Sequence, residues 1–368
     1  SDVHLGAELV PHARPEAERW LNESPKVDRV LCGMLAHYRE HRRGERPWRL
    51  VIAGDFIDFI GMAIQPNEES GFPLQRNEEE RHHGLGSRPG HTVYKLKAVA
   101  ERHHAVFEAL AQFILQGHSV VLVPGNHDVD FHWKVVRAAF VEEVVKHLPR
   151  RAQRAAARLS IEFSPWFFYV ENLLYVEHGH LFDPVCAHAH PLLPVSPSDP
   201  QHIGWSAADV LLRYVSRPTR GVGTEGHEAF SMLGYIRLAL DMGIAGCLRL
   251  AWRFGRASVR LVSDSFDHMG EGAIHLKRRG RRRLRRFARK RKMDLARLEA
   301  LMGLHAEPSH TRVASVMQTL MLDRVGLTLG VIMTCAVLPT LRLPWLVLLG
   351  CWSLVIAIGK LLSLWTAR

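Results

Sequence analysis

The sequence predicts a layered α/β protein with a helical insert and an apolar, transmembrane-like helical hairpin at its C-terminal end. Two short apolar runs, 49–54 and 119–125, each stop at a glycine, and a segment with apolar residues at helical spacing, 94–117, lies between them. Short strands that alternate with amphipathic helices are typical of α/β architecture. Two charge-free apolar runs near the C-terminus predict the hairpin.

The core elements are assigned in chain order. RLVIAG (49–54) and SVVLVPG (119–125) predict buried strands, because short apolar runs that end at a glycine are typical of them. The segment 94–117 predicts a helix that stops at a glycine. FFYVENLLYVEHG (167–179) predicts two strands that turn at Glu171–Asn172.

Four regions follow from composition. The core is expected over 1–184, and it contains a polar, Gly- and Pro-rich loop insert over 61–92. Residues 185–275 have a mostly helical pattern and form either a cap over a site or a helical subdomain packed on the sheet. A basic amphipathic segment is expected over 276–310, and the apolar hairpin occupies 311–368.

The C-terminal hairpin is predicted from two apolar runs, 325–341 and 343–359, each of seventeen residues without a charge. With their apolar flanks, the runs approach the roughly 20 residues that a membrane-spanning helix needs. We therefore expect a membrane hairpin over 325–362, and a buried helical hairpin in a soluble core is the alternative. Candidate interface anchors are Trp345, Trp352 and Trp365.

The positive charge of the chain is confined to one stretch. The net charge is +11, and residues 277–292 contain twelve Lys or Arg and no acid, so the remainder carries a net charge of −1. The five cysteines form no CxxC pair, which argues against a disulfide framework and a zinc finger and indicates a reducing compartment.

The basic stretch 277–292 predicts a polyanionic partner. Anionic membrane lipids are favoured over nucleic acid, because the only aromatic residue within the stretch is Phe287 and the apolar runs follow it. Positive charge near a membrane segment is typical of the cytoplasmic side. The sequence therefore predicts a membrane-associated protein with a cytoplasmic catalytic domain.

Four short polar motifs carry the candidate chemistry. Three of them follow an apolar, strand-like run, and for the first no preceding run is present in the sequence. Each motif alone fits a turn or a helix cap, since Asp and Asn favour such positions. In order, they are SDVHLG with Asp2 and His4, AGDFID with Asp55 and Asp58, PGNHD with Asn126 and His127, and VEHGHLFD with His178.

Together the motifs predict a metal centre. Asp2 and His4 are two residues apart, so at a strand end they face the same side and provide half of a site for a divalent ion. Mixed Asp, His and Asn ligands at strand ends are what two divalent ions about 3.5–4 Å apart require. Such ligands suit Mn, Fe, Zn or Mg-like ions without selecting among them.

At this point the sequence resembles the calcineurin-like metallophosphoesterases. The pattern of that family is D-x-H, G-D-x-x-D, G-N-H-D, a strand-end His and G-H-x-H. The first four parts are matched within about residues 1–184. The resemblance implies a four-layered αββα sandwich with a two-metal centre. The HGHLFD form of the fourth motif is similar to the branch that includes UDP-2,3-diacylglucosamine hydrolase.

The resemblance also implies a role for each matched residue. Asp2 and His4 would hold the first metal, and Asp55 would bridge both metals. Asn126 and His178 would bind the second metal. The remaining two residues would be catalytic: His127 would give a proton to the leaving group, and Asp58 would orient its imidazole.

The final G-H-x-H of the family pattern is not found. His227, His180 and the pair His305 and His310 are weighed as substitutes, and each fits a surface or capping histidine better. We expect the missing pair to lie beyond residue 368, in a chain trimmed at both ends. Histidines given the same plain interpretation, a solvated loop or a Pro-rich stretch, are His82, His83, His91, His188 and His190.

The predicted function is metal-dependent hydrolysis of a phosphate ester or pyrophosphate, with water activated by two metals. Two alternatives remain open at this stage. One is a catalytically impaired phosphoesterase-like membrane scaffold. The other is an anchored phosphodiesterase acting on nucleotides or nucleic acid.

Overall fold

The computed structural model describes residues 2–10, 15–66, 74–219 and 232–320, together with Gly350 and Ser353. Its α-helices are α1 (Pro15–Glu40), α2 (Glu78–His83), α3 (Pro89–Arg102), α4 (His104–Leu115), α5 (Lys134–Val145), α6 (Arg151–Leu159), α7 (Ala207–Leu211), α8 (Met232–Asp267), α9 (Glu271–Arg291), α10 (Leu295–Gly303) and α11 (Val313–Thr319). Shorter helical turns are η2 (Val129–His132), η3 (His180–Phe182), η4 (Leu212–Ser216) and η6 (Ser309–Thr311). The strands are β1 (Arg49–Ala53), β2 (Ser119–Val123), β3 (Ile161–Phe163), β4 (Phe168–Val170) and β5 (Leu174–Val176).

Two small sheets organise the core. Strands β1, β2 and β3 form a parallel sheet in that order, with Ala53 opposite Val123 at its carboxyl edge. Parallel neighbours need a crossover, and the chain supplies α3 and α4 between β1 and β2, then α5 and α6 between β2 and β3. Strands β4 and β5 form a separate antiparallel pair.

The alternation of side chains along β2 joins the two sheets. Val120 and Leu122 face the main core, which contains Phe107, Phe131 and Phe140 from the helical side. Val121 and Val123 point the other way and pack against Phe168 and its strand-pair neighbours. The carboxyl edge of the parallel sheet is thus held between a helical layer and the β4–β5 pair.

The predicted fold was wrong in its architecture. In place of a four-layered αββα sandwich, the described residues form one three-stranded and one two-stranded sheet, and helices predominate. The width of a sheet is set by the number of its strands, and the described residues supply only five, divided between two sheets.

The predicted membrane hairpin over 325–362 lies outside the described residues, apart from Gly350 and Ser353. In the part of the chain that is described, no helix combines the length and apolar character needed to cross a membrane. The longest of these helices, α8, has Arg249, Arg253 and Arg256 along its length. The structure therefore does not support the transmembrane part of the fold prediction.

Individual elements also differ from expectation. The helix expected over 94–117 is two helices, α3 and α4, that break at His103, whose backbone φ and ψ are −104° and 33°. The loop expected over 61–92 contains α2 and the first turn of α3. The two strands expected within 167–179 are confirmed, with Asn172 at φ 57° in the turn.

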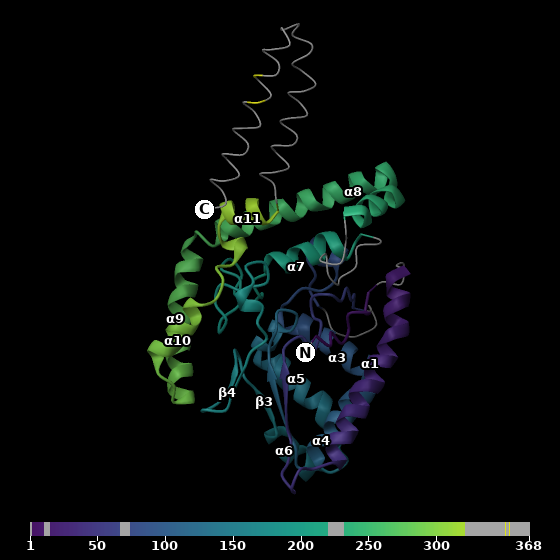
Figure 1. Cartoon of the computed structure of the whole chain (residues 1–368), viewed down its shortest axis with the longest axis vertical. Coiled ribbons are helices and arrows are strands. Elements are labelled where there is room, and N and C mark those ends of the chain that lie inside the picture. Colours follow the sequence, from purple (N-terminus) through teal and green to yellow (C-terminus); the bar gives the residue numbers. More distant parts are fainter. Residues whose placement is uncertain are drawn as a thin grey trace.

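The helical region after residue 185 packs onto the core through its own apolar cluster and two arginines. Val210, Tyr214 and Leu261 are buried together between α7, η4 and α8. Arg217 donates to the carbonyl oxygens of Ile60, Met62 and His83, on the segment that follows Asp58. Figure 1 shows α8 across one end of the molecule beyond α7, and α9 and α10 along one side.

Candidate metal centre

The polar motifs meet at the carboxyl edge of the parallel sheet. β1 and β2 end side by side, so the turns that carry Asp55 and Asn126 start at the same edge. The backbone N–H of His127 donates to Asp55 Oδ1 at 2.9 Å, which ties the two turns together directly. Two motifs separated by 72 residues in sequence thus form one surface.

The N-terminal segment joins this edge by backbone hydrogen bonds. The N–H groups of Val3 and His4 donate to the carbonyl oxygen of Asp55, at 3.1 and 2.9 Å. The N–H of Asp58 donates back to the carbonyl oxygen of Leu5 at 2.9 Å. Asp2 and His4 are thereby placed beside the turn that follows β1.

His178 arrives from the β4–β5 pair. Its Nδ1 lies 3.0 Å from the carbonyl oxygen of Ala53, and its Nε2 lies 3.1 Å from Asp55 Oδ2 and 3.2 Å from Asn126 Oδ1. All four sequence motifs therefore contribute side chains to one place. This proximity was predicted from strand-end patterns alone.

Two glycines make the close approach possible. Gly54 has φ 78°, and a Cβ there would lie 2.5 Å from Cγ and Nδ1 of His178. A Cβ on Gly125 would lie 2.1 Å from Asp55 Oδ1. Any side chain at either position would occupy the space of a candidate ligand, so the glycines that precede Asp55 and Asn126 are part of the site.

Two candidate ligands have unusual backbone conformations. His4 has φ 51° and Asp55 has φ 52°, both in the left-handed region that non-glycine residues visit rarely. The backbone hydrogen bonds between these two residues hold them there. Strain of this kind is typical of functional sites, where the surrounding structure fixes a geometry that the chain would not choose.

The side chains form two groups of three that could each hold a metal ion. One group is Asp2, Asp55 and His178, and the other is His4, Asp58 and His127. In each group the potential ligand atoms lie within 4.8 Å of one another. This division differs from the roles that the family resemblance implies, because Asp2 and His4 fall in different groups.

His4 nevertheless stands between the two groups. Its Nε2 lies 3.7 Å from Asp55 Oδ2, and its Nδ1 lies 3.7 Å from Asp58 Oδ2. The geometry is compatible with a role for His4 on either side. Asp55 likewise contacts residues of both groups, as expected of a shared ligand.

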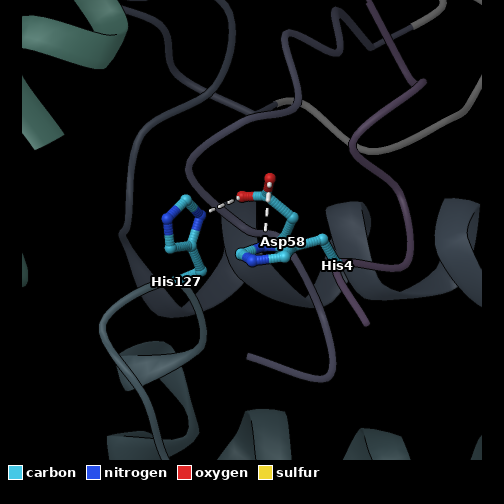
Figure 2. Close-up of side chains that lie close together, drawn as sticks. All are labelled: His4, Asp58 and His127. Atoms are coloured by element: carbon cyan, nitrogen blue, oxygen red, sulfur yellow. Dashed lines mark hydrogen bonds and ion pairs between the residues drawn. The ribbon is translucent and has the colours of Figure 1, made fainter. Parts of the chain in front are cut away.

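His127 and Asp58 form a hydrogen-bonded pair (Figure 2). Nδ1 of His127 lies 2.8 Å from Asp58 Oδ1, and the His4 ring packs edge-on against the His127 ring with centroids 4.4 Å apart. Burial alone would lower the pKa of His127, but the Asp58 carboxylate raises this pKa to about 10. For Asp58, burial is outweighed by the His127 imidazole, which holds its pKa well below the usual range.

This pairing leaves His127 with one free nitrogen. With Nδ1 bonded to Asp58, the Nε2 atom is the one left to exchange a proton with a reacting group. The predicted role of Asp58, to orient the imidazole, agrees with this geometry. Asp58 is itself fixed by the backbone N–H of Ile60 at 3.2 Å.

Asp128 holds together the two turns that carry Asp55 and Asn126. Its two carboxylate oxygens accept from the backbone N–H groups of Gly125 at 2.6 Å and of Phe56 at 2.9 Å. Burial, followed by the nearby charge of Asp55, raises the pKa of Asp128 to about 6. Sequence reasoning did not assign this role, because Phe56 is 72 residues away and only the fold brings it near.

The residues present fit a cation. The contact between His178 Nδ1 and a carbonyl oxygen requires the proton on Nδ1, so in the neutral ring Nε2 presents a lone pair. That lone pair faces an oxygen of Asp55, which also carries lone pairs. Burial opposes a charge on His178, but the Asp55 carboxylate raises the pKa of this imidazole, so either a proton on Nε2 or a cation shared by the two atoms removes the repulsion. An imidazole that donates its other nitrogen to a carbonyl is a common arrangement around bound metals.

Among the histidines considered as substitutes for the missing motif, those that the structure describes do not join either group. The His305 ring packs against Trp166 and Phe182, and His310 is buried against His268. His180 is closer, with its ring centroid 5.4 Å from that of His178. His227 lies outside the described residues.

Other histidines have structural surroundings. His188 is buried with its ring centroid 6.0 Å from that of His180, and His190 packs against Gly280 of α9. His91 is buried and bonded to Glu80 at 2.9 Å, so the solvated loop position expected for it was wrong. His82 is exposed on α2, as expected of a surface histidine.

Comparison with known proteins gives no match among protein-family models, curated proteins or solved structures. The interpretation of this site therefore depends on its own geometry.

Proposed function

We propose that this protein is a metal-dependent phosphoesterase that hydrolyses a phosphate ester or a pyrophosphate. The observation that carries the proposal is the Asp55 carboxylate, which contacts both candidate metal groups and lies 3.1 Å from His178 Nε2. A pair of divalent ions at such a site would bind phosphoryl oxygens and lower the pKa of a water for attack at phosphorus.

The protein residues have separate tasks in this proposal. Asp2, Asp55, His178 and Asn126 would hold one ion. His4 and the shared Asp55 carboxylate would contribute to the other. His127 is kept apart by its bond to Asp58, whose carboxylate favours the protonated imidazole. It is thus suited to give a proton from Nε2 to the departing oxygen.

A non-catalytic scaffold is the second candidate. The observation that favours it is the composition of the two groups, each of which offers three ligand residues, with no second histidine pair beside them in the described ranges. Such a domain would bind metal weakly and turn over no phosphoester. Either candidate function is compatible with association of residues 277–292 with anionic lipid on the cytoplasmic side of a membrane.

The test compares metal content and turnover across leaving groups. The full chain loaded with Mn²⁺ is expected to hydrolyse p-nitrophenyl phosphate and an alkyl phosphate. His127→Ala is expected to keep its metal and to lose roughly 10²–10⁴-fold in kcat on the alkyl phosphate, whose leaving group needs a proton, and less on p-nitrophenyl phosphate. Asp55→Ala is expected to lose metal and activity together.

The control is His104→Ala, which removes an exposed imidazole from α4 and should change neither quantity. Metal content is measured by elemental analysis of the purified chain. Loss of metal from His127→Ala would overturn the assigned roles. Full metal loading without turnover on either substrate would favour the scaffold.

A further inference from the structure

An exposed apolar stripe runs along α8. After the break at Gly243, where φ is 62°, large apolar side chains recur at intervals of four or seven residues. This spacing places them within about a quarter of the helix circumference. Each is between 59 and 83% exposed. The members of the apolar stripe are Ile244, Leu248, Trp252, Val259 and Phe266.

The stripe is not needed for packing within the fold. The buried side of α8 is a different face, where Ala257 and Leu261 pack against Val210, Tyr214 and Val316. Soluble surfaces carry single exposed apolar side chains routinely, but a continuous row that includes Trp and Phe indicates a binding surface. Exposed Met269 and Ile274 continue the row to the start of α9.

Exposed cations lie to one side of the stripe on α8 and along the neighbouring helix α9. Arg249 and Arg256 are exposed on α8, and ten of the twelve cations of 277–292 are exposed, nine of them on α9 and Lys292 at its C-cap. Within the described ranges these ten form no ion pair with an acidic side chain. Exposed acids near the two ends of the stripe are Asp241 and Glu271.

The other two cations of α9 explain how the helix is attached. Arg283 donates to the carbonyl oxygen of Leu192 at 2.9 Å, and Arg291 donates to Glu162 at 2.8 Å. Together with buried Leu284 and Phe287, they fix one face of α9 to the core. The helix is thus held with its other cations directed to solvent. These cations repel one another, and the attachment of the helix to the core does not depend on them.

We propose that α8 lies flat on an anionic lipid bilayer, with its apolar stripe in the interfacial region and the cations of α8 and of the first turns of α9 facing lipid headgroups. Helices with a Trp-, Leu- and Phe-containing face beside an Arg-rich face bind membranes in this way without crossing them. Figure 1 shows α8 across one end of the coloured part of the chain, beyond α7. The inference does not rest on the proposed phosphoester chemistry.

Lipid fits the surface better than other partners do. Nucleic acid would neutralise the cations but would leave the apolar stripe in water. A second copy of the chain would cover the stripe but would bring the two sets of cations together. An anionic bilayer satisfies both features, because acyl chains take the stripe and headgroups supply negative charge.

The decisive experiment measures the environment of the stripe itself with a fluorophore. Vesicle binding of the full chain would not suffice, because the apolar runs 325–341 and 343–359 could cause it by themselves. The five cysteines are replaced by serine, and an environment-sensitive fluorophore is attached at Leu248→Cys or Val259→Cys. Leu159→Cys and Leu173→Cys, 90 and 80% exposed on the core, provide matched controls. Each labelled chain is mixed with phosphatidylcholine vesicles, with or without phosphatidylglycerol.

The stripe probes are expected to shift to the blue with anionic vesicles and to be quenched by lipids that carry a nitroxide near the headgroup, whereas the control probes do not respond. Silent stripe probes on vesicle-bound protein would overturn the proposal. An equal response to neutral vesicles would overturn its anionic part. A shift that depends on protein concentration without lipid would indicate a second copy of the chain instead.

A second variant gives the size of the effect. Replacing Leu248, Trp252 and Val259 by Gln is expected to weaken binding to anionic vesicles by at least about tenfold, because three apolar side chains no longer leave water. Gln at Leu159 and Leu173 should leave vesicle binding unchanged. Each variant is expected to fold, since all five positions are solvent-exposed, and circular dichroism checks this.

Discussion

The candidate metal centre and the α8–α9 surface are built differently: the centre brings distant segments into contact, and the surface is formed by one continuous segment. At the centre, carboxylates and imidazoles from distant segments contact one another around Asp55 and Asp58, which are each 3% exposed. On α8 and α9, neighbouring residues of one continuous segment remain exposed. The centre is therefore sensitive to small changes of shape, whereas the surface is sensitive to what it meets outside the chain.

The largest effect should come from filling the space beside His178. Gly54→Ala places a Cβ 2.5 Å from the His178 ring at a residue with φ 78°, so both the ring and the turn must shift. We expect the free energy of unfolding to fall by at least about 3 kcal/mol, together with loss of bound metal. Urea unfolding and elemental analysis provide the measurements.

Gly33→Ala is the matched control for this change. Gly33 lies in α1, and a Cβ there would meet nothing within 4 Å. It should leave the metal content unchanged and stabilise the chain by up to about 1 kcal/mol, since Ala favours a helix over Gly. Equal stability of the two variants would show that the turn after β1 is more pliable than the structure indicates.

An intermediate effect is expected from pH at His103, where two helices and the N-terminal segment meet. His103 is buried between Glu8, 2.9 Å from Nε2, and Asp28, 2.7 Å from Nδ1. Burial alone would lower its pKa, but these two carboxylates raise it to about 9. Its charged form therefore stabilises the fold fully below pH 6.5, and this contribution is lost as the pH rises through about 9.

The loss between pH 6.5 and 10 should be at most about 3 kcal/mol, as the pKa shift requires. Urea unfolding across this range provides the measurement. His103→Gln should remove most of the pH dependence, because Gln stays neutral while it retains a donor. A variant with an unchanged pH profile would show that the loss arises elsewhere.

The smallest effect should come from the exposed cations of α9. Arg282→Gln removes a charge that makes no ion pair within the described residues, so stability should change by less than about 0.5 kcal/mol. Thermal unfolding measures this directly. A loss of 1 kcal/mol or more would mean that the basic helix serves the fold, and the contrast between the two regions would weaken.

The site was predictable because strand ends leave a mark in the sequence. A glycine followed by Asp55 or Asn126 after an apolar run indicates a turn at a sheet edge, and the parallel pairing of β1 and β2 brings the two turns together. The division of ligands into two groups was not predictable. It depends on the direction of Asp2 and His4, which is set by backbone hydrogen bonds to Asp55.

The fold was less predictable than the site. Strand β3 contains only two apolar residues, Ile161 and Phe163, and α1 contains Pro25, so neither presents a strong pattern. The wide sandwich was expected from the family resemblance and not from the strand runs themselves. Where the prediction relied on strand runs alone, as for β1, β2, β4 and β5, the structure has strands at those places.

The three carbonyl oxygens bonded by Arg217 have a consequence for how the chain can be divided. They belong to residues 60, 62 and 83, whereas the guanidinium comes from the helical region. Cutting the chain at residue 184 would leave these acceptors without their donor. Two of them, Ile60 and Met62, closely follow Asp58, which bonds His127. The core and the helical region are thus adjacent in sequence and also joined by these hydrogen bonds, so we expect them to unfold together.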